Sequence, residues 1–333
     1  MWTRLLLGVL LASTLAGAAD WSPKLAAQYL DARQKEWFGW PRAASADGPC
    51  VSCHTGMPYL LARPALRRAL GEKEPTAYET GLLNRLRAKA GEKPAGALQG
   101  VETIFAALFL ARQDPTGAAT GRAFDQLATL QNHEGRLAGA WPWYNANLDP
   151  WETPPSFFYG ASLAALALGS APDEIHSSAA TGRQLHASQE YFDARLPDQP
   201  LHSRLALLWA STKVPALLAR DARQSLIEEI LRKQQPDGAW TIESLGPWSN
   251  HPDAPVSNGG NSYATAFTAY VLQQAGAASP RAMQWLASHQ DQETGAWPAV
   301  SMNKHYPAGS MEEKFLQDAA TAFAALALIE SAH

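Results

Sequence analysis

One short pattern recurs along the chain and restricts the folds that the chain can adopt. The segments LATLQNHEGRLAGAW (127–141), LRKQQPDGAW (231–240) and LASHQDQETGAW (286–297) each end an amphipathic helix. Each then carries Gln, a turn with Gly and an acidic residue, and Gly-Ala-Trp. A fainter copy, LDARQKEWFGW, covers residues 30–40. Self-similarity of this kind is typical of repeat architectures, in which each unit buries its apolar face on the next.

The spacing of these copies predicts six helical hairpins. The tryptophans that end the copies lie about 100, 100 and 57 residues apart, so a period near 50 requires two further hairpins without the marker. Segments with helical apolar spacing supply them, ending near residues 90 and 191. The first helices are expected at about 23–36, 76–89, 118–132, 178–192, 219–235 and 279–289. The second helices are expected at about 57–70, 101–112, 154–169, 200–211, 261–275 and 315–331.

The two sets of helices differ in character. Segments of the second set, such as SFFYGASLAALALG and LQDAATAFAALALIE, are small or apolar on nearly every side, whereas the first set carries a charged face. Helices that are apolar all round are buried ones. An inner ring of six helices inside an outer ring of six satisfies both patterns, and no strand pattern competes with it. The sequence therefore predicts an all-α fold, an (α/α)6 toroid that forms a single domain over residues 20–333.

The Gln-turn-Gly-Ala-Trp repeats resemble the QW motifs of the squalene–hopene cyclase and prenyltransferase superfamily of toroids. Four of the six hairpins carry the motif, and two carry it cleanly, from Gln234 to Trp240 and from Gln290 to Trp297. The resemblance implies a bracing role, in which Gln caps helix ends and Trp stacks on the next repeat. The residues that take this role by resemblance are Gln131, Gln234, Gln290, Trp141, Trp240 and Trp297.

The activities of that superfamily do not carry over with the fold. Its cyclases protonate an alkene with an Asp-rich D-x-D-D motif, which is absent from this sequence. Its protein prenyltransferases hold zinc with Asp, Cys and His, whereas the only two cysteines here, Cys50 and Cys53, belong to a different motif.

That motif is C-x-x-C-H, formed by Cys50, Cys53 and His54 within DGPCVSCHTGMPY (47–59). A thioredoxin-like dithiol would need a βαβ context, and a zinc site would need a fourth ligand. Haem attachment needs two thiols three positions apart for the vinyl groups and the next His for the iron. The sequence therefore predicts one covalent haem c on the loop at about 41–57, with His54 as the proximal iron ligand.

The N-terminus agrees with this cofactor, because c-type haem is attached outside the cytoplasm. MWTRLLLGVLLASTLAGAAD has one Arg, an apolar run and small residues near a cleavage point, which predicts a signal peptide over residues 1–19. A periplasmic or secreted location follows, and no later segment is apolar enough to predict a transmembrane anchor. The net charge of −4 and the lack of a basic run argue against nucleic-acid partners.

The haem loop joins the first helix of a hairpin to the second, as do the long loops at about 133–153, 241–260 and 296–314. In a toroid, connections of this kind emerge at one mouth, so the four loops are expected to converge there. The expected mouth-lining residues are Trp143, Tyr144, Asp149, Trp151, Glu152, Trp248 and Tyr306.

The distal side of the haem has several candidate ligands. Met57 follows His54 by three residues, too short a link to reach the opposite face of the iron. The remaining candidates are Met302, Met311, His305 and His251, and an open sixth position is the other possibility. A Met or His ligand suits electron transfer, whereas an open site suits small-molecule or peroxide chemistry.

Two functions follow from these features. The first is electron transfer with a redox partner protein. The alternative is a haem enzyme that oxidises a substrate at the mouth, which by analogy with the superfamily would be hydrophobic and isoprenoid-like. A lower alternative is a glycan-active α/α barrel, in which Asp149 and Glu152 would form part of a carboxylate pair. Whether the protein is an enzyme is left open by the sequence.

Overall fold

The computed structural model describes residues 21–45 and 48–331, and within them it contains thirteen α-helices and no strand. The predicted signal peptide lies outside the described residues. The first helices of the hairpins are α1 (Pro23–Gly39), α3 (Ala77–Lys89), α5 (Ala118–Leu130), α8 (Ala179–Arg195), α10 (Arg220–Arg232) and α12 (Pro280–Ser288). The second helices are α2 (Gly56–Ala69), α4 (Gln99–Gln113), α6 (Ser156–Gly169), α9 (Leu201–Ser211), α11 (Ser262–Gln274) and α13 (Phe315–Glu330). All twelve predicted helices are confirmed, and the all-α class with them. One short helix, α7 (Asp173–His176), was not predicted.

Several helices begin where a side chain can satisfy their free N–H groups. Ser22, Ser178 and Ser279 each accept a hydrogen bond from a backbone N–H in the first turn of α1, α8 and α12. Thr76 and Glu79 form a reciprocal capping box at the start of α3. Such caps each contribute about 1 kcal/mol, which explains why the predicted starts agree with the observed ones.

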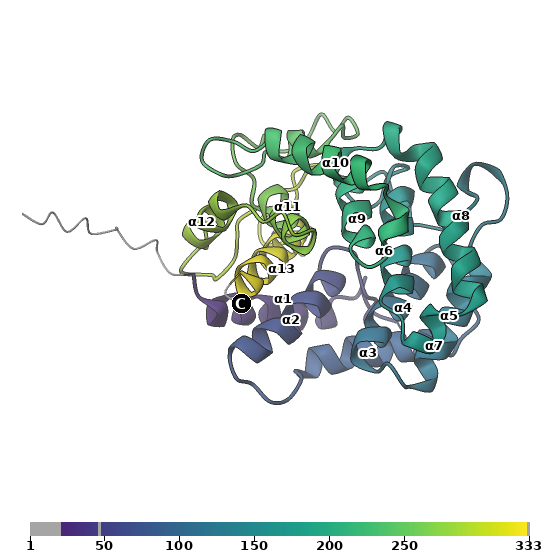
Figure 1. Cartoon of the computed structure of the whole chain (residues 1–333). Helices are drawn as coiled ribbons and strands as arrows, with labels where there is room; N and C mark the ends of the chain where they lie inside the picture. Colours follow the sequence, from purple (N-terminus) through teal and green to yellow (C-terminus); the bar gives the residue numbers. More distant parts are fainter. Residues whose placement is uncertain (1–20, 46–47, 332–333) are drawn as a thin grey trace, which may run out of the picture.

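Burial separates the two sets of helices as the sequence indicates. In α6, α11 and α13 almost every residue is buried, whereas α8 and α10 bury one face and expose the other. Along the second set, α2 packs on α13, α13 on α11, α11 on α9, α9 on α6 and α6 on α4. Figure 1 shows α3, α8, α10 and α12 at the periphery and α6, α9, α11 and α13 nearer the centre.

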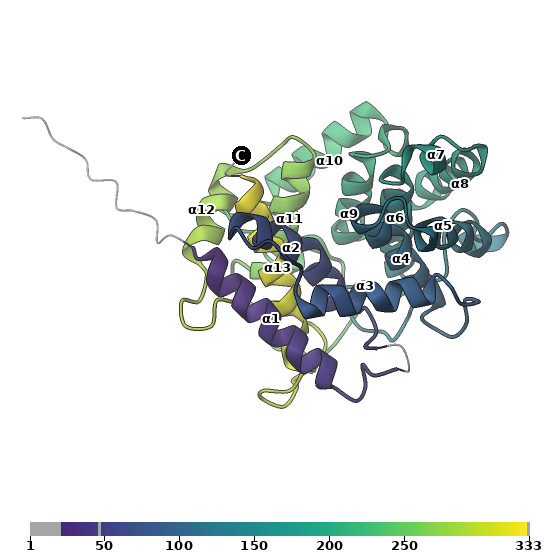
Figure 2. The same cartoon turned by 90° about the horizontal axis from the view of Figure 1, so that it is seen from below.

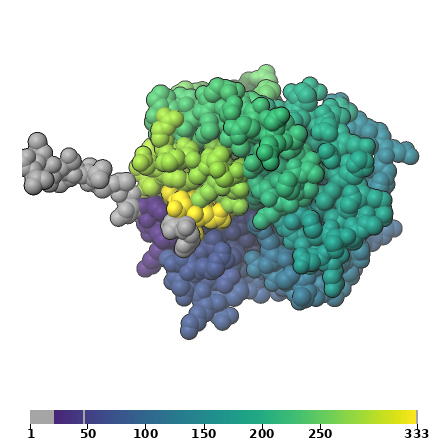
Figure 3. Space-filling view, viewed as in Figure 1, coloured from purple at the N-terminus to yellow at the C-terminus, as the bar shows by residue number. Residues whose placement is uncertain are grey.

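The two ends of the described chain adjoin. Helix α13 packs against both α1 and α2, although these helices are separated by most of the sequence. In Figure 3 the yellow C-terminal segment accordingly lies against the purple and blue N-terminal segment. Side chains from the first and last hairpins can therefore meet.

The glutamines of the repeated motif join each hairpin to the one that follows. Gln290 Nε2 donates to the carbonyl of Gly295 in its own turn (2.9 Å) and to that of Ser22 (3.0 Å), while its Oε1 accepts from Ser22 N–H (2.6 Å). Gln234 bonds its own Gly238 and Ser279, the cap of α12. Gln131 repeats the arrangement, and its contacts lie on Gly139 and on residues 184 and 188 of α8. Ser22 caps α1, so Gln290 ties the last hairpin to the first.

The glycine and tryptophan of each motif have equally specific roles. Gly139, Gly238 and Gly295 have φ of +86°, +102° and +80°, and a Cβ on each would lie 2.1–2.5 Å from a backbone oxygen of the next hairpin's first helix. Only Gly permits this close approach. The indoles of Trp141, Trp240 and Trp297 are fully buried and donate to backbone carbonyls near the ends of α5, α10 and α12.

The fainter copy at 30–40 lacks this geometry. Gln34 lies within α1 and donates to the carbonyl of Thr55 (2.9 Å), while Trp40 is half-buried and packs on Trp37. The first hairpin therefore uses these residues to hold the C-x-x-C-H loop.

In Figure 2 the loop after α1 and the loop before α13 lie at the same end, opposite the end at which α13 finishes. In the part of the chain that the structure describes, every helix is too short or too polar to cross a membrane.

Candidate haem site

The C-x-x-C-H segment forms a turn between α1 and α2. Ser52 supplies the cap that starts α2, because its hydroxyl accepts from the backbone N–H groups of Thr55 (3.1 Å) and Gly56 (3.1 Å). Helix α1 fixes the other side of the turn, where Trp37 Nε1 donates to the carbonyl of Cys50 (2.8 Å). Hydrogen bonds between side chains and the backbone thus hold the turn at both ends.

The His54 ring is held on three sides. It stacks on Phe315 with ring centroids 3.6 Å apart and meets the edge of Trp37 at 5.4 Å. Its Nδ1 lies 2.9 Å from Thr55 Oγ1, while Nε2 has no hydrogen-bond partner in residues 21–45 and 48–331. Burial, with a smaller contribution from the Arg33 charge, lowers the pKa of His54 to about 3. The ring is therefore neutral, and neutral imidazole is the form that binds a metal.

The two cysteines are free thiols in an apolar setting. Burial raises the pKa of Cys50 to about 11 and raises that of Cys53 well above its ordinary value. A thiol redox centre needs a lowered pKa, because the thiolate is the nucleophile. The dithiol interpretation of the motif is therefore disfavoured.

A zinc centre needs several donor side chains close together. Within the described residues, no three or more His, Cys, Asp or Glu side chains gather so that they could hold a metal ion. Structural zinc is bound by four such ligands.

His54 lines a cavity of about 340 Å³, a size typical of small-molecule sites. Residues of three segments form its walls: the haem loop, the loop at 133–153, and the loop at 296–314 with the start of α13. The principal side chains are Trp40, Arg42, His54, Tyr144, Asp149, Trp151, Glu152, Met302, Asn303, Lys304, Tyr306, Glu312 and Phe315.

Five of the seven expected mouth-lining residues line this cavity, namely Tyr144, Asp149, Trp151, Glu152 and Tyr306. The other two do not line it. Trp143 is buried against Gly160 of α6 and donates to the carbonyl of Trp151 (2.7 Å). Trp248 lies in the loop at 241–260, which does not line the cavity, and its ring centroid is 5.6 Å from that of His202.

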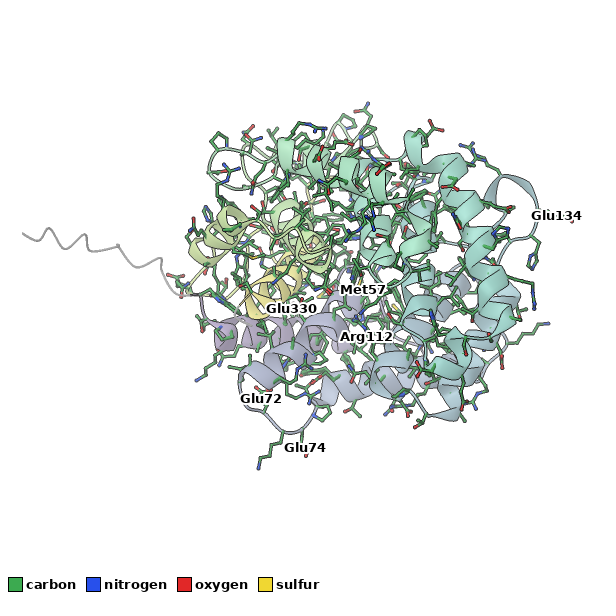
Figure 4. All side chains as sticks on the ribbon, in the orientation of Figure 1. Met57, Glu72, Glu74, Arg112, Glu134 and Glu330 are labelled. Atoms are coloured by element: carbon green, nitrogen blue, oxygen red, sulfur yellow. The ribbon has the colours of Figure 1, made fainter. Side chains whose placement is uncertain are left out.

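The four distal candidates lie in different places. Met302 alone shares the cavity with His54. Met311 is buried beside Arg33, with its sulfur 3.3 Å from Nη1, and His305 lines a neighbouring recess. His251 lies 3.2 Å from the Asp149 carboxylate. Met57 is fully buried among apolar side chains, toward the centre of the molecule in Figure 4.

Asp149 joins three loops. Its backbone N–H and C=O pair with the side-chain amide of Asn303 (2.8 and 2.9 Å), and its carboxylate accepts from Ser249 N–H (2.8 Å). With His251 also against it, this carboxylate is occupied in holding the loops together. Its contacts are those of a structural residue, which weakens the glycan-cleaving interpretation.

Glu152 differs from Asp149, because burial raises its pKa to about 7. Its backbone forms an isolated bridge with Leu148, which sets the side chain at the cavity wall. A carboxyl group with this pKa is able to accept or donate a proton near neutral pH.

The sequence analysis did not name several residues that the site uses, among them Thr55, Asn303, Phe315 and Asp318. Asp318 carried a signal, since it is a carboxylate within the otherwise apolar segment that forms α13. The others gave none, because their role depends on which loops meet in space.

The donor set fits a covalent haem. It comprises two unpaired thiols three residues apart and a neutral imidazole that lines a cavity and has one nitrogen, Nδ1, engaged by Thr55. Cys53 is only 5% exposed and does not line the cavity, so its thiol is reachable only before the loop packs or when it opens. A haem bound here would therefore have to be attached before the loop packs fully.

Comparison with known proteins gave no match to any family model and no match among curated proteins.

Proposed function

We propose that this chain is a c-type haem protein that transfers electrons, with one haem joined to Cys50 and Cys53 and ligated by His54. The observation that carries the proposal is the state of His54. The ring is neutral, its Nδ1 is engaged by Thr55, and it borders a cavity that also contains a methionine side chain. The bound haem would supply an iron that cycles between ferric and ferrous states.

Other parts of the proposal follow from the cofactor and the fold. The helices form an (α/α)6 toroid with the haem loop at one mouth, supported by the sequential packing of α4, α6, α9, α11, α13 and α2. The protein is exported to the periplasm or secreted by means of the signal peptide at residues 1–19. Its partner is a redox protein that docks at this mouth, and nucleic acid is not a partner.

The residues around His54 have distinct tasks in this account. Phe315 and Trp37 fix the plane of the imidazole, and Trp151, which lines the same cavity, has its ring centroid 6.2 Å from that of His54. Met302 offers a thioether in the same cavity as the sixth ligand. A Met ligand raises the potential relative to a nitrogen ligand, which suits an electron carrier.

The surface near the site offers a route for the electron. Trp40 lies at the cavity wall and is only half-buried, with the Arg42 guanidinium 5.0 Å from its ring centroid. Trp37 lies between Trp40 and His54: its ring centroid is 5.3 Å from that of Trp40 and 5.4 Å from that of His54. Docking of a redox partner over Trp40 would therefore bring it close to the haem ligand.

The alternative function is a haem enzyme, and Glu152 is the observation that favours it. An acid–base group that titrates near pH 7 at the wall of the haem cavity is suited to move a proton to or from a bound oxidant. A long isoprenoid substrate is less well supported. Between α9, α11 and α13 the interior contains closely packed rings, including His202, Tyr263, Phe267 and Phe323.

The test is a set of absorption spectra of ferric, ferrous and carbon monoxide-treated protein, matured in a periplasm that has haem-attachment machinery. We expect a sulfur-to-iron charge-transfer band and no carbon monoxide shift. Met302→Ala should abolish the band and admit carbon monoxide. Met311→Ala, which removes a sulfur held by Arg33, is the matched control and should retain the band. Rapid carbon monoxide binding by the wild-type protein would refute the electron carrier and favour the enzyme.

A further inference from the structure

A chain of hydrogen bonds leads from His54 to the last helix. His54 Nδ1 lies 2.9 Å from Thr55 Oγ1, and Thr55 Oγ1 donates to Asp318 Oδ2 at 2.7 Å. Asp318 lies in the first turn of α13, and its side chain is only 1% exposed. Thr55 and Asp318 are 263 positions apart in the sequence. The Thr55 hydroxyl alone connects this carboxylate to the His54 ring.

The Asp318 carboxylate is surrounded by donors. Its Oδ1 accepts from Tyr29 Oη (2.8 Å) and Arg33 Nε (2.7 Å), and its Oδ2 accepts from Arg33 Nη2 (3.1 Å) as well as from Thr55. Burial raises the pKa of Asp318, and the Arg33 guanidinium opposes that rise. A carboxyl proton would displace one of these four donors, so the group acts as an acceptor only.

The direction of every bond in the chain follows. Thr55 has one hydroxyl proton, which it donates in the hydrogen bond to Asp318. The hydroxyl oxygen can therefore only accept a hydrogen bond from His54. Nδ1 of His54 must then carry the ring proton. Nε2 is left with a lone pair and has no hydrogen-bond partner among the described residues, and the ring belongs to a residue that lines the cavity.

The Thr55 hydroxyl takes part only in the hydrogen bonds between His54 and Asp318. Thr55 occupies the N-cap position of α2, where a Thr side chain ordinarily accepts from the helix backbone. Here it makes no such bond, and Ser52 caps the helix in its place. The residue most suited to cap α2 is thus used between His54 and Asp318.

We propose that Asp318, acting through Thr55, is a positioning residue that holds His54 in the Nδ1–H tautomer and directs its Nε2 lone pair into the cavity. This inference rests on the proposed function for its purpose, since a haem iron would take that lone pair. The tautomer itself belongs to the folded chain without haem. Because Asp318 lies on α13, the ligand is set in place only when the first and last hairpins have packed together.

The physical consequence is a stronger donor at Nε2. A carboxylate linked to the distant ring N–H fixes the orientation of a metal-binding His and raises its basicity, and loss of such a partner typically costs 10–100-fold in affinity. Stronger donation favours the ferric state. Loss of the Thr55 hydroxyl should therefore raise the reduction potential of the haem protein.

The experiment is long-range ¹H–¹⁵N correlation of the apoprotein labelled at histidine, near pH 7. We expect the His54 Nδ1 to have the shift of a protonated nitrogen and Nε2 that of an unprotonated one. Thr55→Val, which keeps the shape and removes the hydroxyl, should populate the Nε2–H tautomer. Thr55→Ser keeps the hydroxyl and should resemble the wild-type protein. Since neither variant alters the Ser52 cap, a purely structural role would change stability without moving these shifts.

Two results would overturn the proposal: an Nε2–H tautomer in the wild-type protein, or unchanged shifts in Thr55→Val. If Thr55→Val fails to fold, the wild-type spectrum alone decides. Failure of the proposed function is separable, because it would appear as a lack of haem attachment while the apoprotein tautomer remained as predicted. In the haem-loaded protein, a higher potential in Thr55→Val than in Thr55→Ser is the corresponding second readout.

Discussion

The close approach between hairpins can be tested with two glycines that share a backbone conformation. Gly295 has φ of +80° and Gly309 has φ of +76°, so alanine at either position must adopt the left-handed region. A Cβ at position 295 would lie 2.3 Å from the carbonyl oxygen of Leu25 in α1. A Cβ at position 309 would have no atom within 4 Å. The pair therefore separates the effect of conformation from that of contact.

The expected costs differ by about 2–3 kcal/mol. Gly309→Ala should cost about 1–2 kcal/mol, the penalty of the left-handed conformation. Gly295→Ala bears the same penalty, and α1 must also retreat by about 1 Å to reach an ordinary contact distance of about 3.5 Å. Overpacking of this kind costs about 1–3 kcal/mol. It also strains the bonds between Gln290 and Ser22, each worth about 1 kcal/mol. The total for Gly295→Ala is about 4 kcal/mol.

Thermal unfolding followed by far-ultraviolet circular dichroism measures the difference. At about 2 °C per kcal/mol for a chain of this size, Gly295→Ala should unfold about 5 °C below Gly309→Ala. Gly238→Ala should behave like Gly295→Ala, since its Cβ would lie 2.5 Å from the carbonyl oxygen of Arg281. Equal unfolding temperatures for the variants at 295 and 309 would refute the claim that the motif glycine is required by the next hairpin.

Three further predictions concern charge and the loops. Burial raises the pKa of Glu152 to about 7, so the folded protein binds the carboxyl proton more tightly than the unfolded chain does. In urea unfolding, Glu152→Gln should therefore add about 1–3 kcal/mol to the unfolding free energy at pH 8 and little at pH 4. Burial lowers the pKa of His202 to about 3, so the folded protein loses stability as pH falls below about 6.5. His202→Phe should reduce the dependence of the unfolding free energy on pH in this acid range by up to about 1.4 kcal/mol per pH unit. An unchanged dependence would contradict the buried, neutral state of His202. Asn303→Ala removes both bonds to the Asp149 backbone and should speed protease cleavage in the loops at 133–153 and 296–314, with the unfolding temperature lowered by only a few degrees; unchanged cleavage would show that Asn303 does not join them.

The helices were predictable because their signals are local. Apolar periodicity and caps such as Ser22 and Ser279 lie within one turn of the helix ends that they specify. The motif glycines were visible in the repeat, but the reason for them was not, because the oxygen that excludes a Cβ belongs to the next hairpin.

The site was only half predictable for the same reason. His54 and its two cysteines form a contiguous motif, whereas the partners of His54 come from α1, α13 and the loops. The four distal candidates could not be ranked from the sequence, since nothing local distinguishes Met302 from Met311. Their separation comes from Arg33, which approaches the Met311 sulfur outside the cavity.

Charge at the opposite end of the molecule also required the structure. Figure 4 shows Arg112 and Glu330 near the middle of the face at which α13 ends, whereas Glu74 and Glu134 point outward at the rim. Burial raises the pKa of Glu330, and Gln274 donates a hydrogen bond to its carboxylate. Arg112, Gln274 and Glu330 come from α4, α11 and α13 in turn, so only the packing of the second helices brings them to one face.

The central claim is that Cys50 and Cys53 carry a haem. The most direct measurement is the intact mass of protein matured in a periplasm with haem-attachment machinery, followed by mass mapping of the proteolytic peptide that contains residues 50–54. The account predicts one covalent haem on that peptide, lost when both cysteines are replaced by Ala. An unmodified mass, from protein that is exported and folded in that host, would contradict it.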